Sequence, residues 1–539
     1  MPSSKNAPPT LPTVAAHAAV SGDASYPTAG SHPRRTWITN ECIRTTVTLV
    51  IFAAYFAWTW PWYFKHGVPL DTDLPQGSWS AGFSSDSQTT HEQGVEFETE
   101  GVLRAPPLEV PKSLQTKWAQ YSPWHALDKY RPPPAACNIT QVNILQRHGA
   151  RYPNLLDGQN YSIAVDHLAS ADKFRDKRLK FLEEYEYDLG ADDLVPLGAS
   201  QTFEAGQIAF QRYTSLVNTT QIPFVRAAGA PRVISTATNW TVGKYSKRAV
   251  VRVLPNNQAG FAAASHQRYQ PYLNVIISEE YNNTLNNDCP NAGDGSRETN
   301  IWLSVFAPPL AERLLKGAPG AHLSNMDVFS LMAMCPFDSV AKETLSPFCS
   351  MFTEEDFRAF EYYGDLEKYY KTGYGEKLGP VQGVGYVNEL LARLQGKPVE
   401  DRTTHNHTLE FPLDRTVYAD FTHENLMVAV YAALGLFNVS APLDPRRLPP
   451  AGHEDQDPSG QSWVAARMVP FSSRMVTERL MCVSDEGEER AYVRVLVNDA
   501  VQPLEFCGGQ DGLCELERFV QSQEYARASG KGDFDLCYG

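Results

Sequence analysis

The residues best suited to chemistry are found in RHGARYP, residues 147–153, where His148 lies between Arg147 and Arg151. A short apolar run at residues 142–145 precedes them, of the kind that forms a buried strand in an α/β protein. Arginines at such a strand end can hold phosphoryl oxygens by charge-assisted, bidentate hydrogen bonds. An imidazole between them can then attack phosphorus. The alternative is a surface histidine among solvated arginines. We interpret the stretch as a site of covalent phosphoryl transfer.

A second stretch, YADFTHEN at residues 418–425, is followed by the apolar run LMVAVYAALGL. This pattern predicts a strand that ends at a helix N-terminus, with His423 and Glu424 at the junction. Backbone amides and the helix dipole favour a bound anion at such a place. The two stretches must therefore meet if they serve one phosphoryl group.

The full R-H-G-x-R-x-P string resembles the signature of the histidine acid phosphatases. Further stretches resemble fungal phytases, from about Lys117 to the last residue: KWAQYSPW, YDLGADDLVPLG, LGPVQGVGYVNELLARL and VRVLVNDAVQPL. This resemblance implies an α/β fold with a mixed sheet, helices on both of its faces and a mainly helical cap. The site would then lie at the strand C-termini, between sheet and cap.

The resemblance also implies roles for individual residues. His148 falls on the nucleophile, Arg147, Arg151 and His423 fall on phosphate-binding positions, and residues 226–236 match a segment that places Arg232 on the phosphate. Where the family has an aspartate as proton donor, this chain has Glu424, which has similar acidity and a longer reach. The alternative is that Glu424 is only a first-turn helix carboxylate. The family chemistry needs neither metal nor cofactor.

The rim of the expected site bears on substrate preference, because phytases line the mouth of the site with lysines. Here Asp157 stands where the family has a basic residue, and Lys368 is kept but follows Glu367. A less basic rim should weaken binding of a polyanion more than binding of a simple monoester.

Two other motifs have competing interpretations. Asp192 and Asp193, in YDLGADDLVPLG, are expected to form a glycine turn with an aspartate N-cap before a helix, rather than a paired-carboxylate site. The glycines of residues 378–394 could cradle phosphate, but no G-K-[ST] follows them, so close helix packing is favoured. A hairpin is expected over residues 493–504, with its turn at Asn498 and Asp499.

Length and charge limit the possible functions. The 539 residues suffice for one large domain with an inserted subdomain, or for two domains. The net charge of -15 argues against nucleic acid as a partner, since little would neutralise a phosphate backbone. A local arginine cluster can still bind a single phosphate.

The N-terminal region predicts a membrane anchor. Residues 1–40 read as a disordered cytosolic tail, residues 41–64 as a transmembrane signal anchor, and residues 65–116 as a stalk. Arginines before the apolar run and aromatic residues after it predict a cytosolic N-terminus, with the domain 117–539 outside or in the secretory or vacuolar lumen. A cleaved secretory signal, which would release the protein, and a buried core helix are the alternatives.

Cysteine usage also indicates export. Of nine cysteines, Cys42 is set aside and the other eight form an even set without zinc-site spacing. The resemblance implies the pairs Cys137–Cys482, Cys289–Cys537, Cys335–Cys349 and Cys507–Cys514. Sequons predict N-glycans at Asn138, Asn160, Asn218, Asn239, Asn282, Asn406 and Asn438.

Together these features predict a membrane-anchored, phytase-like phosphomonoester hydrolase that acts through a phosphohistidine. One alternative is a broad acid phosphatase with weak activity on inositol hexakisphosphate. Another is a catalytically idle surface receptor for phosphorylated ligands, which would need neither nucleophile nor acid. A phosphoglycerate-mutase-type enzyme shares the R-H-G core, but the anchor and cysteines place this chain outside the cytosol.

Overall fold

The structure is a computed structural model that describes residues 104–218, 220–245, 272–280, 283–449, 463–484, 486–509 and 511–539. Among these residues, no helix has both the length and the apolar character needed to cross a membrane. The predicted tail at 1–40, the anchor at 41–64 and most of the stalk at 65–116 lie outside the described residues.

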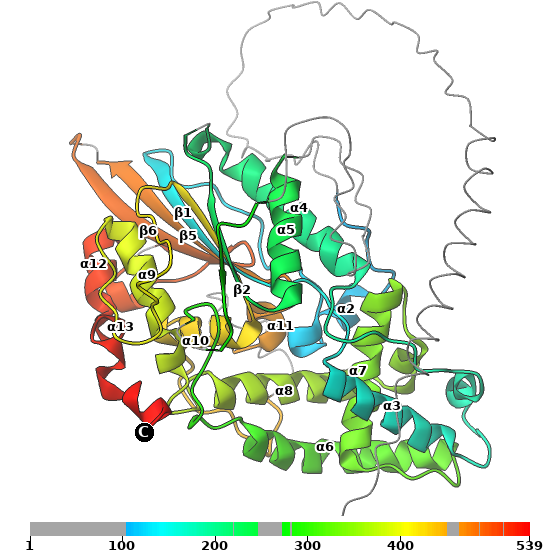
Figure 1. Cartoon of the computed structure of the whole chain (residues 1–539). Coiled ribbons are helices and arrows are strands. Elements are labelled where there is room, and N and C mark those ends of the chain that lie inside the picture. The colour runs from blue at the N-terminus through cyan, green and yellow to red at the C-terminus, as the bar shows by residue number, and fades with distance from the viewer. Residues whose placement is uncertain are drawn as a thin grey trace, which may run out of the picture. The chain divides into compact units, whose positions relative to one another are not determined.

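A mixed, eight-stranded sheet forms the centre of the fold, as the resemblance implied (Figure 1). Its order is β3-β2-β4-β1-β5-β6-β7, and β8 also pairs with β6. The first four strands in this order are parallel, and β5 to β8 join antiparallel. The strands are β1 (Cys137–Arg147), β2 (Phe224–Ala228), β3 (Val275–Ile277), β4 (Val417–Thr422), β5 (Arg474–Val483), β6 (Glu489–Val497), β7 (Ala500–Val501) and β8 (Cys514–Glu515).

The central strands are buried on both faces along most of their length, although they carry polar side chains such as Asn143, Arg226 and Asp420. On one face, Phe421 of β4 meets Trp240 of α5 (Pro231–Tyr245) edge to face. The preceding residue, Asp420, points to the other face and pairs with Arg393 of α9 (Val384–Gln395). Helices therefore cover both faces, as predicted.

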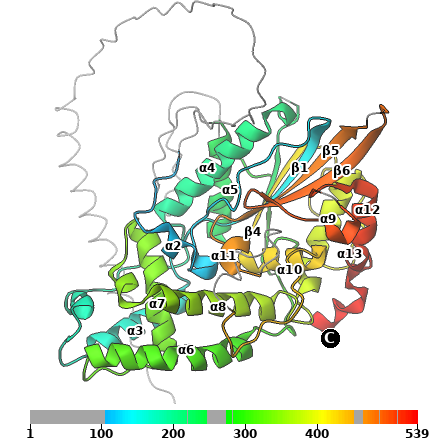
Figure 2. The ribbon, with the colours of Figure 1, turned by 180° about the vertical axis from the view of Figure 1, so that it is seen from behind.

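A second, mainly helical layer packs around its own apolar cluster, beyond the strand ends (Figures 1 and 2). It contains α3 (Leu155–Ala169), α6 (Ser296–Gly317), α7 (Asn325–Lys342) and α8 (Glu354–Lys371). Capping boxes begin α7 and α8, at Ser324 and Thr353, because each hydroxyl bonds the amide three residues on. This layer is the helical cap that the resemblance implied.

The remaining helices complete the two layers. They are α2 (Lys112–Gln115), α4 (Pro196–Arg212), α10 (Glu424–Leu434), α11 (Ala465–Met468), α12 (Leu516–Ser522) and α13 (Glu524–Arg527). α4 packs along α5 on one side of the sheet, whereas α9, α10 and α13 contact one another on the other side.

The register of the two central parallel strands positions the predicted site. β1 and β4 run side by side with Arg147 opposite Thr422, the last residue of each strand. The residues that follow, His148 and His423, therefore emerge at the same edge of the sheet. β2 and β3 are parallel to them and end at that edge as well.

Several local predictions are confirmed and one is wrong. The 493–504 segment forms the hairpin of β6 and β7, with positive φ at Asn498 and Asp499. A Cβ atom added to Gly383 would lie 2.4 Å from the backbone of α10, so that glycine serves close packing. The aspartate N-cap is wrong, because α4 starts after Val195 and has no side-chain cap.

The structure contains the four disulfides that the resemblance implies: Cys137–Cys482, Cys289–Cys537, Cys335–Cys349 and Cys507–Cys514. Cys137 and Cys482 lie directly opposite each other on β1 and β5. Of the seven sequon asparagines, those exposed are Asn138, Asn160, Asn218 and Asn438, those half-buried are Asn239 and Asn406, and Asn282 lies outside the described residues.

Candidate active site

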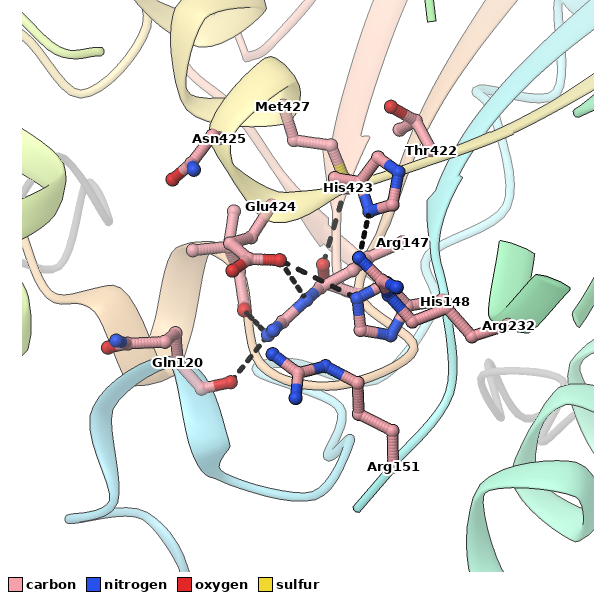
Figure 3. Close-up of polar contacts among 12 residues, drawn as sticks. Gln120, Arg147, His148, Arg151, Arg232, Thr422, His423, Glu424, Asn425 and Met427 are labelled. Atoms are coloured by element: carbon pink, nitrogen blue, oxygen red, sulfur yellow. Dashed lines mark hydrogen bonds and ion pairs between the residues drawn. The ribbon is translucent and has the colours of Figure 1, made fainter. Parts of the chain in front are cut away.

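Arg147, the last residue of β1, is completely buried at the base of the site (Figure 3). Its Nη1 donates to the carbonyl oxygens of Gln120 and Val469, the latter at 2.7 Å. Its carbon Cζ lies 4.6 Å from the ring centroid of Phe471. These contacts fix the guanidinium, yet Nη2 has no hydrogen-bond partner among the described residues. A buried, unpaired donor of this kind favours an anion.

His148 follows directly and is 1% exposed. Its Nδ1 lies 2.9 Å from the carbonyl oxygen of Gly149, and a carbonyl only accepts, so Nδ1 carries the proton. Burial lowers the pKa of His148 well below its usual value; Glu424 opposes this by its hydrogen bond and its charge, and the charges of Arg147 and Arg151 add to the lowering. The imidazole is thus neutral, with the lone pair of Nε2 turned into the site.

Glu424 begins α10 and lies across the site from His148. Its Oε2 is 3.7 Å from Nε2 of His148 and 3.0 Å from Nε of Arg147. Burial raises the pKa of Glu424, but Arg147 and Lys368 outweigh burial and hold that pKa well below its usual value. The carboxylate is therefore ionised and paired with Arg147.

Lys368 on α8 lies deeper than an exposed rim residue, with 2% exposure. Its Nζ donates to Oδ1 of Asn425 at 2.9 Å and to Oε1 of Glu367 at 3.1 Å, and lies 3.7 Å from Oε1 of Glu424. Glu367 also accepts from Nε2 of Gln120 at 2.8 Å. The cap thus contacts the proposed proton donor through this lysine.

Two more arginines complete the cationic part. Arg151 is 4% exposed, and its Nη1 donates to the Tyr152 carbonyl oxygen at 2.8 Å. Arg232 lies in the first turn of α5, with Nη1 3.6 Å from Oδ1 of Asp192. The Nε atoms of Arg151 and Arg232 are buried without a hydrogen-bond partner in the described part of the chain. In Figure 3, the guanidinium groups of Arg147, Arg151 and Arg232 gather around the His148 ring.

His423 is held by a residue that the sequence analysis missed. Its Nε2 lies 2.7 Å from Oε1 of Glu279, and its Nδ1 lies 3.5 Å from Nη2 of Arg232. A carboxylate only accepts, so Nε2 carries a proton. Burial raises the pKa of Glu279, but the hydrogen bond and charge of His423 outweigh it and lower that pKa overall. Glu279 lies just after β3, so strand-end position was the signal that could have found it.

The structure brings the predicted residues together. Arg147, His148, Arg151, Arg232, His423 and Glu424 converge at the ends of β1, β2 and β4, and Asp157 lies in the first turn of α3. Within the described ranges, no group of three or more His, Cys, Asp or Glu side chains is arranged to hold a metal ion. Chemically, the arrangement offers buried cationic donors, a neutral imidazole and one carboxyl group to a tetrahedral anion.

Residues 138–498 match the family described as the histidine phosphatase superfamily, branch 2. The chain belongs to this family. The chain is also 38% identical over 438 residues to Phytase A of Arthroderma benhamiae, covering 77% of this chain and 91% of that protein. Phytase A of Aspergillus fumigatus is 38% identical over 434 residues, covering 77% and 89%. This histidine phosphatase is thus a phosphomonoester hydrolase, as the sequence predicted.

Solved structures agree on the fold. The phytase from D. castellii superposes with a TM-score of 0.60 at 21% identity, covering 78% of this chain and 85% of that one. The Bifidobacterium longum multiple inositol polyphosphate phosphatase, in complex with phosphate, gives 0.52 at 15% identity over 76% and 98%. At these identities the comparison establishes the histidine phosphatase fold.

Proposed function

We propose that the chain is a phytase-like phosphomonoester hydrolase in which His148 is the nucleophile and Glu424 the proton donor. The observation that carries this proposal is the 3.7 Å approach of Glu424 Oε2 to Nε2 of a neutral, buried His148, beside unpaired arginine donors. Relatives named phytase A, similar over most of the chain, support inositol hexakisphosphate and related organic phosphates as substrates.

In the first step, Nε2 of His148 bonds to phosphorus while the ester P–O bond breaks. Arg147, Arg151, Arg232 and His423 stabilise the charge on the phosphoryl oxygens. Glu424 gives its proton to the leaving alkoxide. In the second step, water attacks phosphorus, loses a proton to Glu424, and releases phosphate and His148.

Glu424 must move for this to happen. In an in-line displacement the leaving oxygen lies opposite the nucleophile, with phosphorus between them. The Glu424 carboxylate now lies against Nε2, where the phosphoryl group must enter. An incoming phosphate would replace it on Arg147, remove its main stabilising charge and raise its pKa, so that it takes up the proton that it later donates.

The nucleophile can be tested by rapid quench. Enzyme mixed with a ³²P-labelled monoester and quenched in alkali should carry label on His148, and His148→Ala should carry none. Wild-type enzyme that binds the monoester without ever becoming labelled would instead fit the idle receptor.

A broad acid phosphatase with weak activity on inositol hexakisphosphate is the second candidate. Carboxylates at the mouth of the site favour it: Asp157 is half-buried in the first turn of α3, and Glu367 replaces a basic neighbour of Lys368. The ratio of kcat/KM on inositol hexakisphosphate to kcat/KM on a simple monoester separates the two candidates.

We also propose that residues 41–64 anchor the protein, with the domain 117–539 glycosylated on the non-cytosolic side. The apolar run with its flanking charges, the paired cysteines and the exposed sequons support this. The full chain should stay in the membrane pellet after alkaline carbonate extraction, whereas a chain lacking residues 1–64 should not. Treatment of the full chain with an endoglycosidase should remove its N-glycans and increase its mobility in a denaturing gel.

A further inference from the structure

We propose that Thr236 is a positioning residue for the hydrolase reaction, because its hydroxyl joins the loop of the nucleophile to the helix that carries Arg232. The inference rests on the hydrolase function proposed above and adds to it a residue whose role is to orient the reacting groups. Thr236 lies in the second turn of α5 and is completely buried. Its hydroxyl group takes part in two hydrogen bonds, one as acceptor and one as donor.

As an acceptor, Oγ1 of Thr236 binds the backbone amide of Gly149 at 3.0 Å, across 87 residues of sequence. Gly149 directly follows the nucleophile in the R-H-G motif, and it is buried. A buried amide that loses its hydrogen-bond partner cannot turn to water instead, so its free energy rises. The position of Gly149 therefore depends on this hydroxyl.

As a donor, the same hydroxyl binds the carbonyl oxygen of Arg232 at 2.9 Å, four residues earlier in α5. A threonine hydroxyl has one proton and two lone pairs, so it can serve both partners at once. Arg232 in turn reaches His423, with Nη2 of the arginine 3.5 Å from Nδ1 of the histidine. Thr236 thus connects the helix turn of an arginine that we assign to phosphate with the loop of the nucleophile.

Gly149 passes this constraint to the imidazole of His148. Its carbonyl oxygen accepts from Nδ1 of His148 at 2.9 Å, which directs Nε2 into the site. A side chain would not fit at Gly149, because an added Cβ atom would lie 2.6 Å from the carbonyl oxygen of Gly198 in α4. Gly149 is therefore held at its amide by Thr236, packed at its Cα atom against α4, and bonded through its carbonyl group to the nucleophile.

The neighbouring contacts of the loop come from the main chain. The amide of His148 donates to the carbonyl oxygen of Thr422 at 3.0 Å, and its carbonyl oxygen accepts from the amide of Ser472 at 2.9 Å. Bonds of this kind persist whatever side chains the residues carry. Thr236 supplies a side-chain anchor to the same loop, so a single substitution can release it.

Loss of the hydroxyl should slow chemistry more than binding. An unpaired Gly149 amide favours a shifted loop, and an Nε2 atom displaced with that loop no longer meets phosphorus at the productive distance and angle. We expect attack on phosphorus to slow by about tenfold. Inorganic phosphate should bind almost as tightly as before, because the guanidinium of Arg147 keeps its bonds to the carbonyl oxygens of Gln120 and Val469.

The test compares three substitutions in α5. Thr236→Val keeps the branched shape of the side chain and removes the hydroxyl, whereas Thr236→Ser keeps the hydroxyl and removes the methyl group. Thr241→Val is the matched control, because Thr241 is completely buried in the same helix and its hydroxyl donates at 2.8 Å to the carbonyl oxygen of Thr238, within α5. Each hydroxyl bonds its own helix, and that of Thr236 also bonds the loop of the nucleophile.

The readout is the release of 4-nitrophenolate in a single turnover, with enzyme in saturating excess over 4-nitrophenyl phosphate. The observed rate constant then reports the step in which His148 attacks phosphorus, and a fraction of unfolded enzyme does not change it. This leaving group needs little protonation, so the rate depends only weakly on Glu424. The inhibition constant of inorganic phosphate, measured in parallel, reports binding.

We expect Thr236→Val to lower this rate constant about tenfold and to change the inhibition constant of phosphate by less than about threefold, while Thr236→Ser and Thr241→Val stay within about twofold of the wild type. A Thr236→Val rate constant within about twofold of the wild type would overturn the inference and leave the hydrolase intact. An equal loss in Thr236→Ser or in Thr241→Val would also overturn it, since the bond to Gly149 would not be the cause. A wild type that releases no 4-nitrophenolate would instead contradict the proposed function, and this inference with it. Thr236→Ala, which also removes the hydroxyl, takes the place of Thr236→Val if that variant does not fold.

Discussion

Two arginine clusters lie near the C-terminal end of β4, and they differ in the partners that their guanidinium groups have. Within β4, Asp420 accepts from Nε of Arg226 at 2.7 Å and from Nη1 of Arg393 at 2.5 Å, while Glu389 accepts from Nη2 of Arg226 at 2.6 Å. We call these four residues the paired cluster. Every one of them is buried.

At the end of the same strand, the site arginines keep donors without hydrogen-bond partners among the described residues: Nη2 of Arg147 and Nε of Arg151 and of Arg232. In the paired cluster, Nε of Arg393 also has no such partner, but both Nη atoms of Arg393 donate to Asp420. We call Arg147, Arg151 and Arg232 the open cluster. In the paired cluster, attraction between opposite charges offsets the free energy of removing them from water, and so this cluster serves the fold. The open cluster leaves that cost to be met by a bound anion. The comparison teaches that the partner of a buried arginine, more than its burial, separates a structural arginine from a binding one.

The sharpest test of this difference removes the nucleophile beside the open cluster. His148→Ala should lower kcat/KM on any monoester by about 10⁴-fold or more, because no other group supplies the lone pair. The free energy of unfolding should change little, since the lost ring contributes no charge pair. Activity within tenfold of wild type would show that the nucleophile lies elsewhere.

Next in size is the proton donor. Glu424→Gln should lower kcat by about 10²–10⁴-fold on alkyl phosphates, and by less on 4-nitrophenyl phosphate, whose leaving group needs little protonation. Equal losses on both esters would contradict the role of Glu424. Glu424→Asp is the matched control, because it keeps the acid while withdrawing the carboxylate from Nε2 of His148. It should bind inorganic phosphate more tightly than the wild type, measured as a lower product-inhibition constant.

Breaking the paired cluster should act on stability instead. Asp420→Asn leaves Arg226 and Arg393 without their shared charge, and should reduce the free energy of unfolding by about 3–5 kcal/mol in denaturant titrations at pH 7. Burial raises the pKa of Asp420, but both arginines outweigh it and bring that pKa to about 2. A lowered folded-state pKa gives stability that is complete above the unfolded pKa of about 4 and lost as the pH falls toward 2.

The difference between Asp420→Asn and wild type should therefore persist at pH 5 and shrink only between about pH 4 and pH 2. A difference already gone at pH 5 would mean that Asp420 is not ionised in the folded protein. Asp166→Asn, exposed on α3, provides the comparison for a carboxylate without a buried partner.

The smallest effect is expected at Glu279, which accepts from Nε2 of His423 at 2.7 Å and so fixes the orientation of that ring beside Arg232. Glu279→Gln should lower kcat/KM on 4-nitrophenyl phosphate by about tenfold or less, because an uncharged amide oxygen makes a weaker hydrogen bond to Nε2 than a carboxylate does. A loss of more than about a hundredfold would contradict a positioning role for Glu279.

Much of this site could be predicted from the sequence, because the nucleophile and acid lie in contiguous motifs beside apolar strands. The register of β1 against β4 then brings the two motifs together, because it pairs Arg147 with Thr422. Arg232 was predicted only through the resemblance, because a single arginine at a helix start has no local signature.

Other parts depended on tertiary contacts that no local pattern specifies. Glu279, just after β3, reaches His423 from 144 residues away in the sequence, and Lys368 reaches Asn425 from another layer. Asp192 looked like a helix cap in sequence, but its positive φ turns it away from α4 and toward Leu155 and Arg232. Charge partners across layers are set by packing, so sequence spacing cannot supply them.

The alignment of β1 with β4 has a consequence for how the chain can change. Because successive side chains of a strand point to opposite faces, one inserted residue in either strand would turn a histidine away from its counterpart. Segments joining the strands can lengthen at little cost, since closing a longer loop adds only slowly to the entropy penalty. Insertions should therefore be tolerated in the segments between the strands but not within β1 or β4. The relative register of these two strands is what the enzyme has to keep.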